Sequence, residues 1–422
     1  MSCSPYFSRV LPALLLTLGA CDSAPQAIHT IHTDSAGVPI ATAVTPLWGP
    51  DEGWAVDELL VEIGTVDGPP EYQFADVVAA VRLGNGDIVV ADRGSSELRS
   101  YDAEGTFLWR TGREGEGPGE FRSLDFLGRM AGDSLVTYDM RLVRAQVFDS
   151  GGRVARTLPV LVPGLATTTG SSPDKAVAVL DGRLIVRFID LGVGTPSGIV
   201  RWPDERVVAL DLASGTGTSL MVVPGPEAMV EWRAEDHYIH GSYVFGKGPE
   251  YGAAAGRLAV IDTEAYAVRI VSPTDGSLLS LVRRDVAPLE ATEAVFQSLL
   301  DGVVEEVFAD PEEAPPEQVA LLRQNWTERP RAPLLPVLRS VHVDGTGNLW
   351  VTPHYVAGAD PPPFEVFAPD GLWLGTVSIP PGLDRGFLQY GAPDLEIGDD
   401  YILGVWTGEL DVQYVRMYRL NR

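Results

Sequence analysis

Short apolar runs alternate with turns rich in glycine and aspartate along the chain from about residue 77 onward. The first four runs cover residues 77–83, 88–91, 98–101 and 107–110. Two of the turns between them, 84–87 and 102–105, read Gly-Asn-Gly-Asp and Asp-Ala-Glu-Gly. Runs of this length between such turns are typical of β-strands joined by hairpins. The segment therefore predicts a four-stranded antiparallel meander of about 45 residues.

The same plan returns along the rest of the chain. In three units the third strand starts six residues after the aspartate that closes the second strand, counted from Asp92, Asp139 and Asp262. The last unit holds three strands, and the run 59–64 near the start of the body can supply the fourth. Closure of this kind leaves a circular array without free edge strands. The pattern therefore predicts an all-β fold, a six-bladed β-propeller in which the N-terminal strand closes the last blade.

Two intervals between units are longer than the others and predict insertions, at about 216–255 and 288–336. The second insertion has a convincing helical pattern, because its apolar residues recur in pairs every four positions from 295 to 308. Asp310-Pro311 ends this helix and Pro315-Pro316 opens the next. We expect a helical hairpin that packs on the rim of the neighbouring blades. The alternative is a lid, or a groove for a partner.

The N-terminus carries an export signal. Arg9 precedes the apolar run 10–20, which is too short to span a bilayer. The run ends in Leu-Gly-Ala-Cys at 18–21, which resembles the lipobox of bacterial lipoproteins. The resemblance implies a signal peptide over 1–20 and a diacylglycerol on Cys21, with an ordinary secretory cleavage site as the alternative. We expect residues 21–52 to form a tether and 53–422 to form the propeller.

The glycine-rich connector at 112–121, with sequence Gly-Arg-Glu-Gly-Glu-Gly-Pro-Gly-Glu-Phe, resembles a segment of the bacterial six-bladed β-propeller lipoproteins, relatives of the NHL-repeat proteins. Residues 337–351 resemble the penultimate blade of the same family. The resemblance covers roughly 54–422. It implies an extracytoplasmic binding platform and supplies no shared catalytic motif.

Charge and composition then exclude several classes of partner. The formal net charge of −27 disfavours nucleic acid, because binding a phosphate backbone relies on clustered cations. An acidic body is also repelled by anionic headgroups, so we expect attachment through the acyl chains alone. Cys3 leaves with the signal peptide and Cys21 is lipidated, so we expect no disulfide in the fold. Of 31 cations only Lys175 and Lys247 are lysines, which is typical of a GC-rich genome.

The sequence contains weak candidates for metal-binding residues. There is no nucleophile elbow, no Walker loop and no dinucleotide fingerprint. His237, His240 and Asp262 could contribute to a metal site. A Ca²⁺- or Zn²⁺-dependent propeller hydrolase or lyase with its site at the channel mouth is therefore the alternative function. Aspartates at strand ends are mostly turn formers, however, because they bond nearby backbone N–H groups.

Four side chains near blade connectors are candidates for a ligand-binding face: Arg93, Arg113, Arg141 and His354. We predict no catalytic residue and no cofactor. The expected function is a lipid-anchored binding or scaffold module for an envelope protein, peptide or glycan, with its body in the periplasm or at the cell surface.

Overall fold

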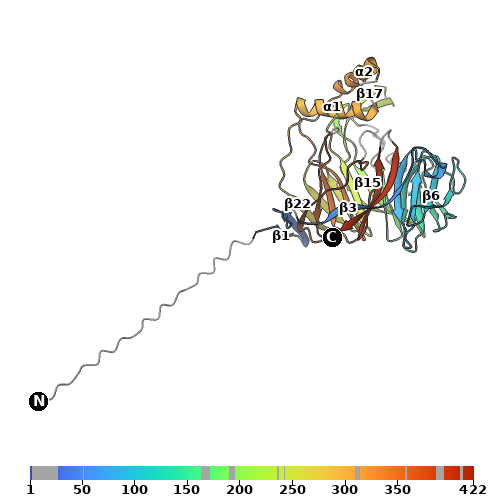
Figure 1. Ribbon diagram of the computed structural model, residues 1–422. Coiled ribbons are helices and arrows are strands. Elements are labelled where there is room, and N and C mark those ends of the chain that lie inside the picture. The colour runs from blue at the N-terminus through green and yellow to red at the C-terminus, as the bar shows by residue number, and fades with distance from the viewer. Residues whose placement is uncertain are drawn as a thin grey trace.

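Six four-stranded antiparallel blades surround a central axis, one of them extended by two N-terminal strands into a six-stranded sheet, so the predicted six-bladed β-propeller is confirmed (Figure 1). The computed structural model describes residues 27–50, 52–162, 172–189, 195–234, 237–241, 243–308, 314–356, 359–385, 394–408 and 412–422, together with Met1. Cys21 and the predicted signal peptide lie outside these ranges, apart from Met1.

The strands of each blade follow one another in chain order. Blade one comprises β4 (Val77–Arg82), β5 (Ile88–Asp92), β6 (Glu97–Tyr101) and β7 (Phe107–Thr111). Blade two comprises β8 (Leu124–Arg129), β9 (Leu135–Asp139), β10 (Arg144–Phe148) and β11 (Val154–Pro159). Blade three comprises β12 (Ser172–Leu180), β13 (Arg183–Ile189), β15 (Glu205–Asp211) and β16 (Gly217–Val223).

The second half of the ring repeats this order. Blade four comprises β19 (Pro249–Ala254), β20 (Arg257–Asp262), β21 (Ala267–Val271) and β22 (Leu278–Arg284). Blade five comprises β23 (Leu338–Val343), β24 (Leu349–Pro353), β25 (Phe364–Phe367) and β26 (Trp373–Val377). Blade six comprises β27 (Glu396–Ile397), β28 (Tyr401–Thr407), β29 (Gln413–Asn421) and β3 (Ala55–Ile63). The first strands of blades one to five contact one another in succession around the axis.

The N-terminal strand closes the last blade, as predicted. Strand β3 pairs antiparallel with β29, from Ile63 opposite Val415 to Ala55 opposite Asn421. The Arg416 Nε donates to the Glu62 carboxylate across the same pair at 2.7 Å. The outer edge of blade six is thus formed by a segment from the other end of the chain, which ties the ring together.

Apolar side chains fill the space between blades. The six largest clusters of buried residues lie one at each of the six blade interfaces. Trp350 and Trp406, both fully buried, belong to the cluster between blades five and six. Full burial of a large apolar side chain stabilises a fold by roughly 1.5–3 kcal/mol, so packing between the blades is a main source of stability.

The expected tether over 21–52 is wrong for much of its length. Strands β1 (Thr30–Ser35) and β2 (Val38–Ala43) form a hairpin whose second strand pairs parallel with β22, the outer strand of blade four. The following backbone continues onto blade five, where the Trp48 N–H donates to the Leu374 carbonyl at 2.7 Å. The N-terminal segment therefore runs along blades four and five before it enters blade six as β3.

Both predicted insertions exist, although the bounds of the first one differ. Strand β16 falls inside 216–255 yet is the fourth strand of blade three, and β19 is the first strand of blade four. Between them lie β17 (Glu227–Ala234) and β18 (His237–Gly241), which join β14 (Gly198–Arg201) in a separate sheet. The second insertion holds the predicted helices, α1 (Glu293–Val307) and α2 (Pro316–Thr327). A short helix, η1 (Pro70–Tyr72), precedes blade one.

Helix α1 begins where its sequence pattern predicts, but the expected packing on the rim of the blades is wrong. Thr292 caps it, since the Thr292 hydroxyl accepts from the Val295 N–H at 3.3 Å. Its buried face, with Phe296 at the centre, contacts Val244, Phe245 and Leu335. These residues lie in segments that lead into blades four and five, so the helix packs on connectors and not on blade strands.

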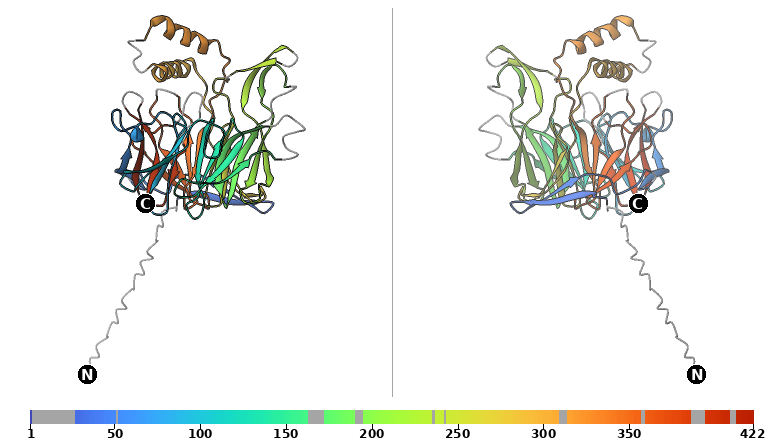
Figure 2. Two further views of the ribbon diagram at one scale, coloured as in Figure 1. Left: turned by 90° about the vertical axis from the view of Figure 1, so that its right-hand side faces the viewer. Right: turned by 90° about the vertical axis from the view of Figure 1, so that its left-hand side faces the viewer.

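All of these inserted elements lie on one face of the ring, which we call the insertion face. In an antiparallel meander the segments that follow the second and fourth strands share one edge. Strand β14 follows the second strand of blade three, whereas β17, β18, α1 and α2 follow the fourth strands of blades three and four. Figure 2 shows the helices and this small sheet on one side of the ring and the N-terminal hairpin toward the opposite side.

Candidate functional site at the channel mouth

The four predicted ligand-face residues all lie in segments on the insertion face, but the structure does not bring them together in one site. Each one follows the second or fourth strand of a blade. Arg93 ties the connector before blade one to β8 of blade two, because its guanidinium lies 2.7 Å from the Asp76 carboxylate and 3.2 Å from that of Asp125. Arg141 is exposed.

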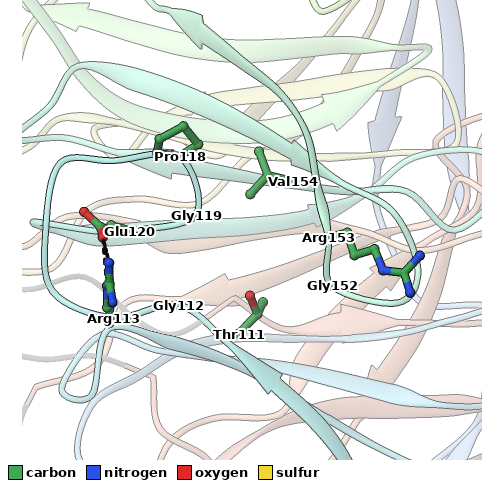
Figure 3. Close-up of a pocket in the computed structure, with 9 residues that line it drawn as sticks. All are labelled: Thr111, Gly112, Arg113, Pro118, Gly119, Glu120, Gly152, Arg153 and Val154. Atoms are coloured by element: carbon green, nitrogen blue, oxygen red, sulfur yellow. Dashed lines mark hydrogen bonds and ion pairs between the residues drawn. The ribbon is translucent and has the colours of Figure 1, made fainter.

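Arg113 lies at the outer edge of the ring, beside an open pocket between blades one and two (Figure 3). Its Nε donates to Glu120 Oε1 at 2.7 Å, and the other Glu120 oxygen accepts from the Gly117 N–H at 2.7 Å. These hydrogen bonds hold the pKa of Glu120 below its usual value, and the one from the Gly117 N–H has the largest effect. The glycine-rich connector therefore closes on itself, as expected for a blade connector.

The aspartates at the ends of second strands are turn formers, as expected from the sequence. Asp92 is fully buried, and its Oδ1 accepts from the N–H groups of Asp76 and Gly94 at 2.9 and 3.2 Å. Asp139 does the same in blade two, accepting from Arg122 and Leu142 at 2.7 and 2.9 Å. Each carboxylate thus joins the incoming connector to the turn after the second strand.

Of the three weak metal candidates, the structure describes the side chain of Asp262 alone. Asp262 pairs with Arg201, whose guanidinium lies 3.1 Å from it. His237 and His240 are in β18, but their side chains lie outside the described residues. No group of three or more histidine, cysteine, aspartate or glutamate side chains in the described ranges is placed to hold a metal ion.

His354 is the predicted residue with the most unusual surroundings. Its Nε2 is buried and has no hydrogen-bond partner among the described residues, and its ring packs edge-on to Phe245 at 6.4 Å between centroids. Burial, together with the charges of Arg339 and Lys247, lowers the pKa of His354 to about 4. The imidazole is therefore neutral near pH 7.

A charged group at the mouth of the central channel was not predicted from the sequence. Four side chains from four successive blades take part: Lys175 on β12, Glu250 on β19, His342 on β23 and Asp394 just before β27. Lys175, Glu250 and Asp394 are all exposed to solvent.

Burial and the charge of Lys175 shift the pKa values of Glu250, His342 and Asp394. Burial raises the pKa of Asp394 to about 6 and raises the pKa of Glu250, and the Lys175 charge opposes both shifts. Burial, with Arg385 and Lys175 adding to it, lowers the pKa of His342 to about 4. Lys175 is thus a charge that groups of blades four, five and six share.

Further charges surround the mouth on the insertion face. Arg339 and Arg385 both lie over the Tyr355 ring, at 4.8 and 6.0 Å from its centroid. Glu306 reaches the same region from the end of α1. Burial and the charge of Asp384 raise the pKa of Glu306 to about 7, while Arg339 opposes the shift. The end of the inserted helix therefore lies near the mouth.

A buried polar network holds the strands that carry Lys175 and Glu250. Asp174, next to Lys175, pairs with Arg187. The Arg187 guanidinium lies 3.8 Å from Glu205, and the Tyr251 hydroxyl, next to Glu250, donates to Glu205 at 3.0 Å. Glu205 is almost fully buried. The network fixes blade three against blade four at the mouth.

One feature of the sequence points to this group once the blades are known. Charged residues stand at or just before the first strand of several blades, where an apolar run is expected, at 175, 250, 339 and 394. The spacing of the repeat alone does not tell which strand of a blade lies at the axis. A charge near the start of a first strand is a signal only after the strand order is known.

Comparison with solved structures finds bacterial proteins that are similar to this chain at low sequence identity. A Bacteroides fragilis protein named as exported is 12% identical over 87% of this chain and 96% of its own, with a TM-score of 0.48. A DUF4221-family member from Bacteroides vulgatus is 9% identical over 88% and 98%, also at 0.48. A Xanthomonas campestris gluconolactonase is 13% identical over 82% and 87%, at 0.38. Such likeness extends to fold alone.

No family model and no curated protein matches the chain. Among the residues described, no helix is both long and apolar enough to cross a bilayer.

Proposed function

We propose that this protein is an exported lipoprotein, anchored through Cys21, that binds an envelope ligand on its insertion face. The observation that carries the proposal is the separation of the two ends of the molecule. The N-terminal hairpin, which leads back toward Cys21, lies toward one side of the ring, and all inserted elements lie on the other (Figure 2). An anchor at Cys21 holds the insertion face away from the membrane.

The charged mouth supports a binding role for this face. Binding sites are usually concave and combine a few convergent polar groups with perturbed pKa values. The mouth provides such groups from four blades, with Glu306 of α1 and Asp384 of the connector after β26 beside them. A peptide or a glycan of the envelope offers complementary charged or hydroxyl groups.

The lipobox resemblance at 18–21 and the acidic charge support the anchor. A body with 58 acidic residues against 31 lysines and arginines gains nothing from an anionic headgroup surface. Acyl chains on Cys21 supply the attachment instead, because each buried methylene contributes about 0.8 kcal/mol to membrane binding.

The orientation is tested with one fluorophore on either face of the anchored protein. Ser150, in the turn after β10, is exposed on the side opposite the insertions, and Ala359, in the loop after β24, is exposed on the insertion face. Variants Ser150→Cys and Ala359→Cys are labelled and placed in vesicles that contain lipids with a nitroxide headgroup. We expect stronger quenching at position 150 than at position 359.

The matched control is each labelled variant combined with Cys21→Ala. We expect these proteins to leave the membrane fraction and to show no quenching. A Cys21→Ala protein that still sediments with membranes contradicts the anchor. Stronger quenching at position 359 contradicts the orientation.

A further inference from the structure

The N-terminal hairpin, β1 and β2, has two different sides. Six of its residues share one side, which we call the hairpin outer face, because side chains alternate along a strand and paired residues point the same way. They are paired in the register of the two strands as Ile31 with Thr42, Thr33 with Ile40 and Ser35 with Val38. On the other side of the hairpin, Ala41 and Ala43 are buried.

The inner side of the hairpin packs against the ring. A Cβ placed on Gly371 would lie 2.4 Å from the Ala41 Cβ, so backbone and side chain approach closely there. Gly371 belongs to the turn between β25 and β26, the third and fourth strands of blade five, which lies on the side opposite the insertion face. The hairpin outer face therefore points away from the ring on that side, where Figure 2 shows the hairpin.

The hairpin outer face is apolar and uncharged, although the chain as a whole is acidic. None of its six residues carries a charge, and Ile31 is 47% exposed. Val44 continues the same alternation beyond Thr42 and is 48% exposed. The Val44 N–H donates to the His29 carbonyl at 2.9 Å, so the pairing of the two segments extends to this residue. Exposed aliphatic side chains that share one surface are typical of a contact with a partner or a membrane.

Strand β22 continues this surface and adds a cation to it. In the parallel register Leu281 lies beside Ile40, and Arg283 lies beside Thr42. The Arg283 Nε donates to the Thr42 hydroxyl at 2.9 Å, so the guanidinium lies on the same side of the sheet. Arg283 is exposed. A cation beside exposed aliphatic side chains suits the boundary between lipid headgroups and acyl chains.

We propose that the hairpin outer face lies on the membrane that carries the anchor, with Ile31 and Val44 at the boundary of the acyl chains and Arg283 on a lipid phosphate. This assignment rests on the proposed function, because it requires the lipid on Cys21. Thr30, which begins β1, follows Cys21 by nine positions, and a chain of that length spans at most about 30 Å. The anchor therefore holds the hairpin near the bilayer surface in every molecule.

A membrane suits this face better than a second copy of the chain does. Contact between two copies would bring together two bodies that each carry a large negative charge. A bilayer with neutral headgroups offers apolar contact without that repulsion. A small apolar surface is also enough to orient the protein, because the anchor raises the effective concentration of this surface at the membrane.

Fluorescence of the mature lipidated protein in phosphatidylcholine vesicles tests the contact. A nitrobenzoxadiazole label is attached at Ile31→Cys, or at the matched control Leu108→Cys, which is also 47% exposed but lies on β7 of blade one. We expect nitroxides on the acyl chains to quench the label at position 31 and its emission to shift to shorter wavelength. Neither effect is expected at position 108.

A second substitution identifies the surface that makes the contact. Val44→Asp places a charge on the hairpin outer face, so it is expected to abolish the quenching and the wavelength shift at position 31 while the protein stays in the membrane fraction. Leu108→Asp is the matched control and is expected to leave both signals unchanged. Both positions are about half exposed, so both variants are expected to keep the circular dichroism spectrum of the wild type.

The outcomes separate this assignment from the proposed function. A protein that stays anchored while the label at position 31 is quenched no more than the label at position 108 contradicts the membrane contact and leaves the anchor intact. A wavelength shift at position 31 that grows with protein density and occurs without nitroxide quenching assigns the face to a second copy and also overturns the proposal. Quenching at position 31 that Val44→Asp abolishes and Leu108→Asp does not supports the membrane contact.

Discussion

Single aspartates hold the repeated joints of this propeller. The carboxylates of Asp102 and Asp149 each accept from two N–H groups in the turn between the third and fourth strands. Asp92 and Asp139 do the same on the other edge. These positions could be predicted from the sequence because short side chains that bond nearby N–H groups leave a fixed spacing. The mouth residues could not, because their proximity arises from ring closure.

Two properties explain a glycine at a turn, a positive φ and a lack of space for a side chain, and the second differs from blade to blade. Gly276 has φ +76°, and a Cβ placed on it would lie 1.7 Å from the Leu220 carbonyl oxygen of blade three. Gly132 has the same φ, and nothing lies within 4 Å of the same position. Both glycines avoid the strain of a left-handed residue, but only Gly276 also fits against a neighbouring blade.

This pair gives a controlled prediction for stability. Gly132→Ala is expected to lower the free energy of unfolding by about 1 kcal/mol through backbone strain alone. Gly276→Ala adds a steric clash and is expected to cost about 2 kcal/mol or more beyond that. Urea denaturation of both variants measures the difference. Equal losses would show that the blade contact at Gly276 relaxes freely.

His354 makes stability depend on pH. Its pKa of about 4 in the folded protein lies below its unfolded value near 6.5, so the folded state binds fewer protons between these values. The contribution is fully present above pH 6.5 and is lost as the pH falls toward 4. The loss is on the order of 1–3 kcal/mol.

Denaturation between pH 4 and 7.5 checks this dependence by comparison of variants. His354→Gln is expected to flatten the fall in stability on acidification relative to the wild type. The matched control is His32→Gln, at an exposed histidine of β1, which is expected to keep the wild-type slope. Variants must be compared because carboxyl groups with a raised pKa, such as Asp394 at about 6, make the folded state more stable as the pH falls over this range, which opposes the effect of His354. An unchanged slope in His354→Gln would contradict the assignment.

At the scale of elements, regular patterns were predicted well and context-dependent ones were not. The paired apolar positions from 295 to 308 predict α1, whose buried residues include Phe296, Leu299 and Leu300. The pattern does not reveal what covers that face. The partners, such as Val244 and Phe245, come from the other insertion, which lies far away in sequence.

The N-terminal hairpin was not predicted, because its sequence signal is a single two-residue turn. Ala36 and Gly37 both have positive φ, at 53° and 85°, which is the geometry of a two-residue hairpin turn. Strand β1 is largely exposed, and only Ala41 and Ala43 of β2 are buried. The scattered Pro, Thr and Ala residues of the segment resembled a linker. Its pairing with β22 depends on a strand edge that exists only in the folded ring.

At the scale of the whole molecule, the repeat and its incomplete last unit were enough to predict a closed ring. The six interface clusters and the pairing of β3 with β29 confirm that prediction. The order of the strands also sorts every connection to one face or the other. Because both long insertions follow fourth strands, they gather on the same face by topology and not by chance.

The proposed function places the ligand on the insertion face. A photoreactive benzophenone attached at Ala359→Cys or at Ser150→Cys in intact cells tests this placement, because the two positions differ in face and share the anchor. We predict an envelope component crosslinked from position 359 and no such product from position 150. A product formed from position 150 alone would contradict this placement.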